Sequence, residues 1–185
     1  MPLTTETTTI DEAIEALEEQ REALADQLAQ IPPAERTPDN DEVVQIQAEA
    51  SEVERHLGGL EWACEQYGGD AVFELAGLTT SEIAHVNDRT NDFRQTTITP
   101  TQSVEGAASV FWIAEGVREA PFFDGVDEAD DPFERKVAAI RGLPKQLTDW
   151  LEAEINDLST VGEREGNSFD ALVAAKSETY HPDSN

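Results

Sequence analysis

Two runs of apolar residues at heptad spacing, joined by a proline-rich segment, most constrain how this chain can fold. The intervals in the first run alternate between four and three residues when Arg21 fills the one gap. Its apolar residues are Ile10, Ile14, Leu17, Leu24, Leu28 and Ile31. The second run keeps the same spacing without a break, at Val43, Ile46, Ala50, Val53, Leu57, Leu60, Cys64 and Tyr67. Because this period places the apolar side chains on one helical face, each run predicts an amphipathic helix with a coiled-coil seam.

The ends of these two helices are also marked in the sequence. Thr9 and Glu12 have the spacing of a capping box, which predicts a helix start near residue 10. The prolines at 32–33 end the first helix, since proline removes a backbone donor and biases the preceding residue towards extended geometry. The glycines at 68–69 end the second helix. We therefore expect residues 10–67 to form an antiparallel coiled-coil hairpin.

Residues 70–160 differ in composition and predict a separate helical domain. Residues 72–75 form a short β-prone run, either a single strand or an extended connector. Cap signals at Thr79, Thr99 and Asp131 each indicate the start of a helix. The most apolar helical face is predicted to be the core of this domain and carries Val104, Ala107, Ala108, Phe111, Trp112, Ala114 and Val117.

The expected fold is therefore mainly α. It consists of the hairpin over residues 10–67 and a small helical bundle domain over residues 70–160, with at most one or two short strands. Residues 1–9 are expected to be a flexible N-terminus. Residues 161–185 are expected to be a flexible C-terminal segment with one short helix at most.

The charge of the chain limits the classes of partner that it can be expected to bind. The 40 acidic residues outnumber the 12 Lys and Arg and give a net charge of −28, spread along all 185 residues. Such a surface repels phosphate backbones and anionic lipids, so neither nucleic acid nor membrane is expected as a partner. Molar salt shortens the Debye length to about 3 Å and makes the surface tolerable. The pattern is typical of salt-in halophilic archaea and predicts a cytoplasmic protein; an acidic DNA mimic is the rival interpretation.

No motif in the sequence indicates a catalytic, cofactor-binding or metal site. The chain lacks phosphate-binding glycine loops and a nucleophile elbow, and its three histidines, His56, His85 and His181, do not cluster. Cys64 is expected to be structural, and His56 and His85 are expected to face solvent. The acidic stretch 124–131 lacks the order of a calcium loop and is expected to be a solvated loop. We expect a protein that is not an enzyme and needs no cofactor.

Two segments resemble the helical tail assembly chaperones of long-tailed viruses. They are GLTTSEIAHVNDRT at 77–90 and GAASVFWIAEGVREAP at 106–121. The family shows a short strand-like segment, a Leu-Thr helix start and a central apolar helix with a W-x-A-x-x-x-R-x-x-P type pattern. That pattern is matched here by Trp112, Ala114, Arg118 and Pro121. The N-terminal hairpin departs from the simplest members and implies an added oligomerisation element.

With the acidic composition, the resemblance implies a tailed virus or provirus of a halophilic archaeon. It implies a homo-oligomer that covers apolar helices of the tape measure protein until tail tube subunits polymerise around it. Such covering has a physical reason, because an exposed apolar helix aggregates. The alternatives are a structural virion component, such as a head-tail connector or adaptor located in the virion, a DNA-mimic inhibitor, and a host coiled-coil module.

The residues expected at partner or oligomer interfaces come from two places. Six lie on the hairpin seam: Leu17, Leu24, Leu28, Val53, Leu57 and Leu60. Three lie on the apolar helix and are expected to shape the partner site: Phe111, Trp112 and Val117. The seam can equally pack only within its own chain, and the sequence leaves both arrangements open.

Overall fold

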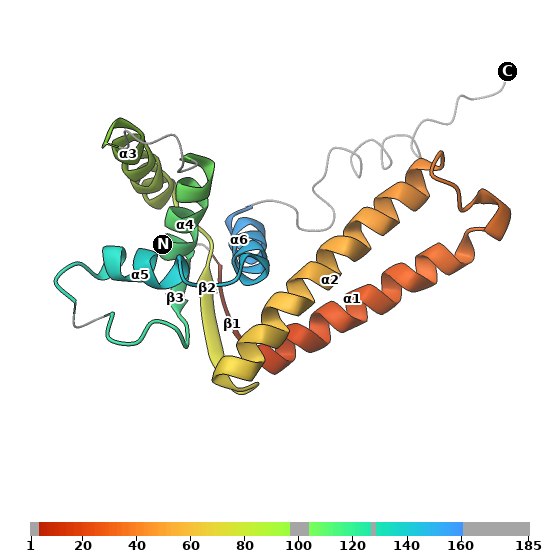
Figure 1. Cartoon of the computed structure of the whole chain (residues 1–185), viewed down its shortest axis with the longest axis horizontal. Helices are drawn as coiled ribbons and strands as arrows, with labels where there is room; N and C mark the ends of the chain where they lie inside the picture. The colour runs from red at the N-terminus through yellow and green to blue at the C-terminus, as the bar shows by residue number, and fades with distance from the viewer. Residues whose placement is uncertain (1–3, 97–103, 127–128, 161–185) are drawn as a thin grey trace, which may run out of the picture.

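The two heptad runs form a long antiparallel helical hairpin. In the computed structural model, which describes residues 4–96, 104–126 and 129–160, the arms of the hairpin are α1 (Ile10–Gln30) and α2 (Asp41–Tyr67). Their connection contains a short 3-10 helix, η1 (Pro33–Glu35). Figure 1 shows the two arms projecting away from the remaining elements. The predicted hairpin is therefore confirmed.

Capping interactions account for the ends of the hairpin helices. The Thr9 hydroxyl accepts from the Glu12 N–H, and the Glu12 carboxylate accepts from the Thr9 N–H, as the capping box predicts. Asn40 caps α2 with a single bond, in which its side-chain oxygen accepts from the Glu42 N–H. At the other end of α2, Gly68 has a φ of 89°, which only glycine adopts without strain.

A small antiparallel sheet joins the hairpin to the helical body. Its three strands are β1 (Thr5–Thr9), β2 (Val72–Ala76) and β3 (Val117–Glu119), in the order β1-β2-β3. Two of them depart from expectation: residues 5–9 form a strand where a flexible N-terminus was predicted, and β3 continues from an apolar helix. Residues 1–3 lie outside the described residues. The strand alternative for residues 72–75 is confirmed.

Tertiary pairing explains why β1 forms although its sequence is polar. Its five residues, TETTT, pair in register with β2, from Thr5 opposite Ala76 to Thr9 opposite Val72. β-branched threonine suits an extended edge strand. The chain then enters α1 directly from β1, so the strand also anchors the first arm of the hairpin.

Four helices form the body beside the sheet. They are α3 (Thr80–Thr96), α4 (Val104–Gly116), α5 (Pro132–Ile140) and α6 (Lys145–Ser159). The predicted caps at Thr79 and Asp131 are present, since each side chain accepts a hydrogen bond from the N–H three residues later. The predicted helix start at Thr99 lies outside the described residues. The fold is mainly helical, as expected.

Helix α6 is central to the packing. It lies against α2, against α4 and against the sheet, where the Trp150 ring is 5.3 Å from that of Phe73. Two glycines permit this approach: a Cβ at Gly59 would lie 2.5 Å from the backbone N of Leu147, and one at Gly116 would overlap Ile155. The core is consequently continuous from the hairpin to the body. Within the described residues, none of the helices is both long enough and apolar enough to span a membrane.

Candidate functional site

The structure places the predicted interface residues inside the protein. Seven of the nine are buried in the chain's own core, and Leu28 and Trp112 are partly buried and pack against that core. On the hairpin, Leu57 is 4% exposed and Leu60 is fully buried. In this conformation the seam between α1 and α2 is therefore filled within the chain, and the surfaces open to a partner lie elsewhere.

The three predicted residues of the apolar helix lie on α4 and at the start of β3, and Figure 1 shows these elements in the body, away from the hairpin arms. The Phe111 ring contacts those of Phe93 and Phe133, which joins α4 to α3 and α5. Val117 is fully buried at the start of β3. The indole Nε1 of Trp112 is buried, and no hydrogen-bond partner for it is present among the described residues.

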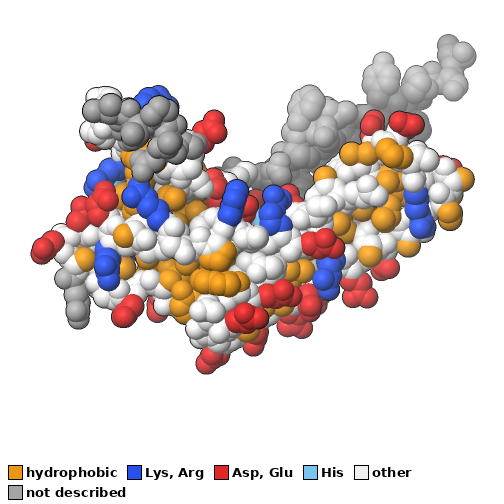
Figure 2. All heavy atoms as spheres, viewed as in Figure 1, with side chains coloured by type: hydrophobic (Ala, Val, Ile, Leu, Met, Phe, Trp, Pro, Cys, Tyr) orange, Lys and Arg blue, Asp and Glu red, His pale blue; other side chains and the backbone are white. Residues whose placement is uncertain are grey.

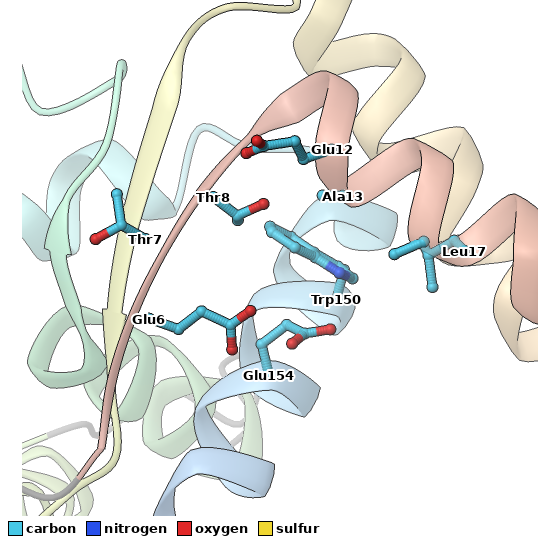
Figure 3. A pocket seen from close by; sticks show the side chains of 9 residues that line it. Glu6, Thr7, Thr8, Glu12, Ala13, Leu17, Trp150 and Glu154 are labelled. Carbon is cyan, nitrogen blue, oxygen red and sulfur yellow. The ribbon is translucent and has the colours of Figure 1, made fainter.

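An open hollow lies where β1, α1 and α6 meet (Figure 3). Its volume is about 370 Å³, and it combines apolar and acidic side chains. It is lined by Glu6, Thr7, Thr8, Glu12, Ala13, Ala16, Leu17, Trp150 and Glu154. Figure 3 shows Glu6 and Thr8 turned from β1 towards Trp150 and Glu154, while Thr7 points away from them. The hollow thus has an apolar floor with carboxylates beside it.

The strand that forms one wall of the hollow has a free edge. On either side of β1, the Thr4 C=O accepts from the Gly77 N–H and the Ile10 N–H donates to the Ala71 C=O, each with an N···O distance of 3.0 Å. Because such bonds alternate along an antiparallel pair, even-numbered residues of β1 bond to β2 and odd-numbered ones point outwards. The N–H and C=O groups of Thr5 and Thr7 therefore face away from the sheet, and no partner within the described part of the chain bonds to them.

Burial and like charge make Glu154 unusual among the acidic residues. Burial raises the pKa of its carboxyl, and the nearby carboxylates of Glu6 and Asp157 raise that pKa further. Glu12 differs, because the Thr9 backbone N–H and hydroxyl lower its pKa by hydrogen bonding in the capping box. The described residues that line the hollow include no Lys or Arg. A cation that entered would therefore meet carboxylates that no Lys or Arg side chain in this lining neutralises.

A second polar groove contains a residue that we expected at the surface. His56 is 7% exposed, so the prediction that it faces solvent is wrong. The reason is that α2 has two buried faces, one against α1 and one against α6, and His56 lies on the second. Burial lowers the pKa of its imidazole, while Glu52 and Asp149 oppose the shift and Arg55 adds to it. The neutral ring acts there as a packing residue.

His85 is exposed, as predicted, but it is engaged. Its Nδ1 contacts the Glu115 carboxylate, and its ring lies 5.2 Å from that of Phe133. Nearby, Arg118 forms a 2.6 Å ion pair with Glu82, which joins α3 to the chain leaving α4. These contacts hold the body helices together.

The hollow and the free edge beside it were not predicted from the sequence. The residues that define the hollow are far apart in the chain, and only the threonine-rich composition of residues 4–9 gave a signal for an edge strand.

Among the described residues, no group of His, Cys, Asp and Glu is arranged to hold a metal ion. A comparison with protein-family models, curated proteins and solved structures finds no match to this chain.

Proposed function

We propose that this chain is a non-enzymatic virus assembly protein, a tail assembly chaperone of a tailed virus or provirus of a halophilic archaeon. It oligomerises and shields apolar helices of the tape measure protein until the tail tube forms. The observation that carries the protein-binding part of this proposal is the free edge of β1 beside the hollow. A strand edge offers main-chain hydrogen bonds, and a partly apolar hollow offers contact area.

The placement of the two segments that resemble the chaperone family supports the viral part of the proposal. Segment 77–90 enters α3, and segment 106–121 comprises most of α4 together with β3. Helices α3 and α4 pack on each other, and Arg118, which matches the family pattern, pairs with Glu82 of the other segment. The two stretches thus form one structural unit.

The surface supports the halophilic part. On the face shown in Figure 2, acidic side chains lie over the hairpin and over the body alike. A DNA mimic needs its carboxylates gathered into a phosphate-like row, whereas a salt-adapted surface needs them spread. We therefore place the protein in the cytoplasm of a host with molar salt, where the net charge of −28 is screened.

The buried seam changes which surfaces the proposed oligomer uses. Because Leu57 and Leu60 pack within the chain, self-association proceeds through the outer faces of the hairpin arms. The arm α1 has 21 residues and spans about 32 Å at 1.5 Å per residue. An arm of that length extends well beyond the body and provides contact area for a long helical partner.

The proposal is tested by following the protein through virus assembly in molar salt. The tagged chain is recovered from an infected or induced lysate, and its amount is compared with that in purified particles. A chaperone binds one very long helical protein in the lysate and is absent from the particles. Co-expression gives a second readout: the long partner should stay soluble with this chain and precipitate without it.

The projecting hairpin favours one alternative, a structural virion component such as a head-tail connector or adaptor. A rigid arm that leaves the body can reach a neighbouring subunit in a permanent ring (Figure 1). A connector remains in the particle at fixed stoichiometry and binds portal or tail tube subunits. Finding the protein there in constant amount would replace the chaperone proposal with this one.

A further inference from the structure

We propose that the free edge of β1 binds an extended segment of a partner protein, which adds a fourth strand to the sheet and places a lysine or arginine side chain in the hollow. This proposal rests on the proposed protein-binding function and names the chemistry of the partner segment. The proposal has two parts: the main chain of the partner segment pairs with β1, and one of its side chains enters the hollow.

The main-chain part of the proposal follows from which residues of β1 direct their N–H and C=O groups away from β2. Thr5 and Thr7 present their N–H and C=O groups on the side away from β2, and both residues are exposed. An open row of this kind is the template that extended peptides use when they join a sheet edge. Thr9 ends the row, since its N–H already donates to the Glu12 carboxylate. The open edge is therefore short, and main-chain bonds alone give little affinity.

The side-chain part of the proposal follows from the position of the hollow, which lies on the face of β1 that carries Glu6 and Thr8. Glu6 and Thr8 point towards α6, so an added strand would direct every second side chain to the same face, over the hollow (Figure 3). There the side chain meets the apolar surface of Leu17 and Trp150, and then the carboxylates of Glu6 and Glu154. A long aliphatic stem with a positive end satisfies both surfaces, as lysine and arginine do.

Charge excludes a second copy as the favoured occupant. A copy paired through its own β1 would bring a second set of Glu6 and Glu154 carboxylates to the same junction, where burial already raises the pKa of Glu154. A positive side chain would instead relieve the repulsion between the existing carboxylates. The partner segment is therefore basic at one inward position and free of acidic side chains on that face.

The probe for this proposal is a synthetic peptide, acetyl-Thr-Val-Thr-Lys-Thr-Val-Thr-amide. Its lysine and valines share one face, and in an antiparallel pairing the threonines that flank the lysine direct their N–H groups towards β1. Two matched peptides serve as controls. One replaces lysine by norleucine and keeps the stem, and the other N-methylates the two flanking threonines and keeps the charge.

Two variants of the full chain complete the design. Thr7→Pro removes an outward N–H that makes no bond to β2, so the existing ladder stays intact. Glu154→Gln removes one carboxylate charge from the hollow with little change in shape. Circular dichroism checks that both variants fold. Binding is measured by calorimetry in molar KCl, with amide hydrogen exchange at Thr5 and Thr7 as the structural readout.

We expect saturable binding of the lysine peptide with slowed amide exchange at Thr5 and Thr7. Methylation of the peptide and Thr7→Pro should each weaken binding by about tenfold or more, because a strand hydrogen bond is lost. Norleucine and Glu154→Gln should each weaken it by about fivefold, the effect of one partly screened ion pair.

Three results would overturn the proposal. Equal binding of the lysine and methylated peptides would mean general attraction to the acidic surface, and no binding would mean that the edge is not a docking site. Slow exchange at Thr5 and Thr7 without peptide, together with a dimeric mass, would assign the edge to a second copy. The tail-assembly test stands apart from all three, since it depends on the partner found in lysate and on the composition of particles.

Discussion

The contact between α2 and α6 can be tested with two neighbouring glycines that differ only in their surroundings. Gly58 and Gly59 are consecutive residues in the middle of α2. A Cβ added at Gly58 would have nothing within 4 Å, whereas one at Gly59 would lie 2.5 Å from the backbone N of Leu147 and 2.6 Å from the backbone carbonyl C of Gln146. Substitution by alanine therefore changes helix propensity at both sites and packing at only one.

The structure sets the size of each effect. Alanine in place of glycine within a helix stabilises by about 1 kcal/mol, and Gly58→Ala should show this gain in full. At Gly59 the same gain is opposed by a clash with backbone that has no rotamer to escape into, so the overpacking cost lies at the upper end of about 1–3 kcal/mol. We expect Gly59→Ala to lose about 2 kcal/mol net, which separates the two variants by about 3 kcal/mol.

Thermal and urea unfolding in molar KCl measure this difference. For a chain of this length, 1 kcal/mol corresponds to about 2–4 °C in Tm. Gly58→Ala should melt about 3 °C above the parent chain and Gly59→Ala about 6 °C below it. If Gly59→Ala proved as stable as Gly58→Ala, α6 would not approach α2 at that residue, and the close packing of α6 on α2 would be refuted.

Three further predictions concern charge. On dilution to low salt the chain should lose much of its helical circular dichroism signal, because screening of the net charge of −28 is removed; full helicity without salt would contradict the halophilic proposal. At Glu82 burial raises the carboxyl pKa, but hydrogen bonds from Thr79 and Arg118 outweigh it and the net shift is downwards. The contribution of Glu82 to folding stability is present above the unfolded pKa and is lost as pH falls through the lowered folded pKa. Glu82→Gln should therefore destabilise the protein by about 1 kcal/mol at neutral pH and by little in acid. The pKa of Glu154 is raised, so the sign is opposite: its contribution to stability is present below the unfolded pKa and is lost as pH rises through the folded pKa. Glu154→Gln should therefore raise Tm at neutral pH. A lower Tm there would contradict the placement of this carboxyl.

The hairpin was predictable because its information is local and periodic. Both heptad runs, the capping box at Thr9 and the prolines at 32–33 occur within single stretches of sequence, and each appears in the structure as predicted. Local caps likewise predicted the starts of α3 and α5. Periodicity alone, however, marks one face of a helix, and α2 buries two. The burial of His56 against α6 was missed for that reason.

The sheet and the hollow were not predictable, because their information is not local. TETTT is polar and short, and it becomes a strand by pairing with residues 63 to 71 positions later in the sequence, from Thr9 with Val72 to Thr5 with Ala76. β3 has three residues and follows an apolar helix without a turn signal. The walls of the hollow come from β1, α1 and α6, so no single stretch of sequence contains the site.

Helix α6 connects the stability of the fold with the proposed site. Gly59 lets the first turn of α6 rest against the hairpin, Trp150 in its middle packs on Phe73 of the sheet, and Glu154 one turn later forms a wall of the hollow. The hollow persists because the side chains there are short: Ala13 and Ala16 on α1 and Thr8 on β1 do not fill the space beside Trp150. In the proposal, a lysine or arginine side chain of an added strand occupies this space. Because the hollow is lined by the hairpin helix α1 and by the body helix α6, a segment bound there would contact both parts of the molecule at once.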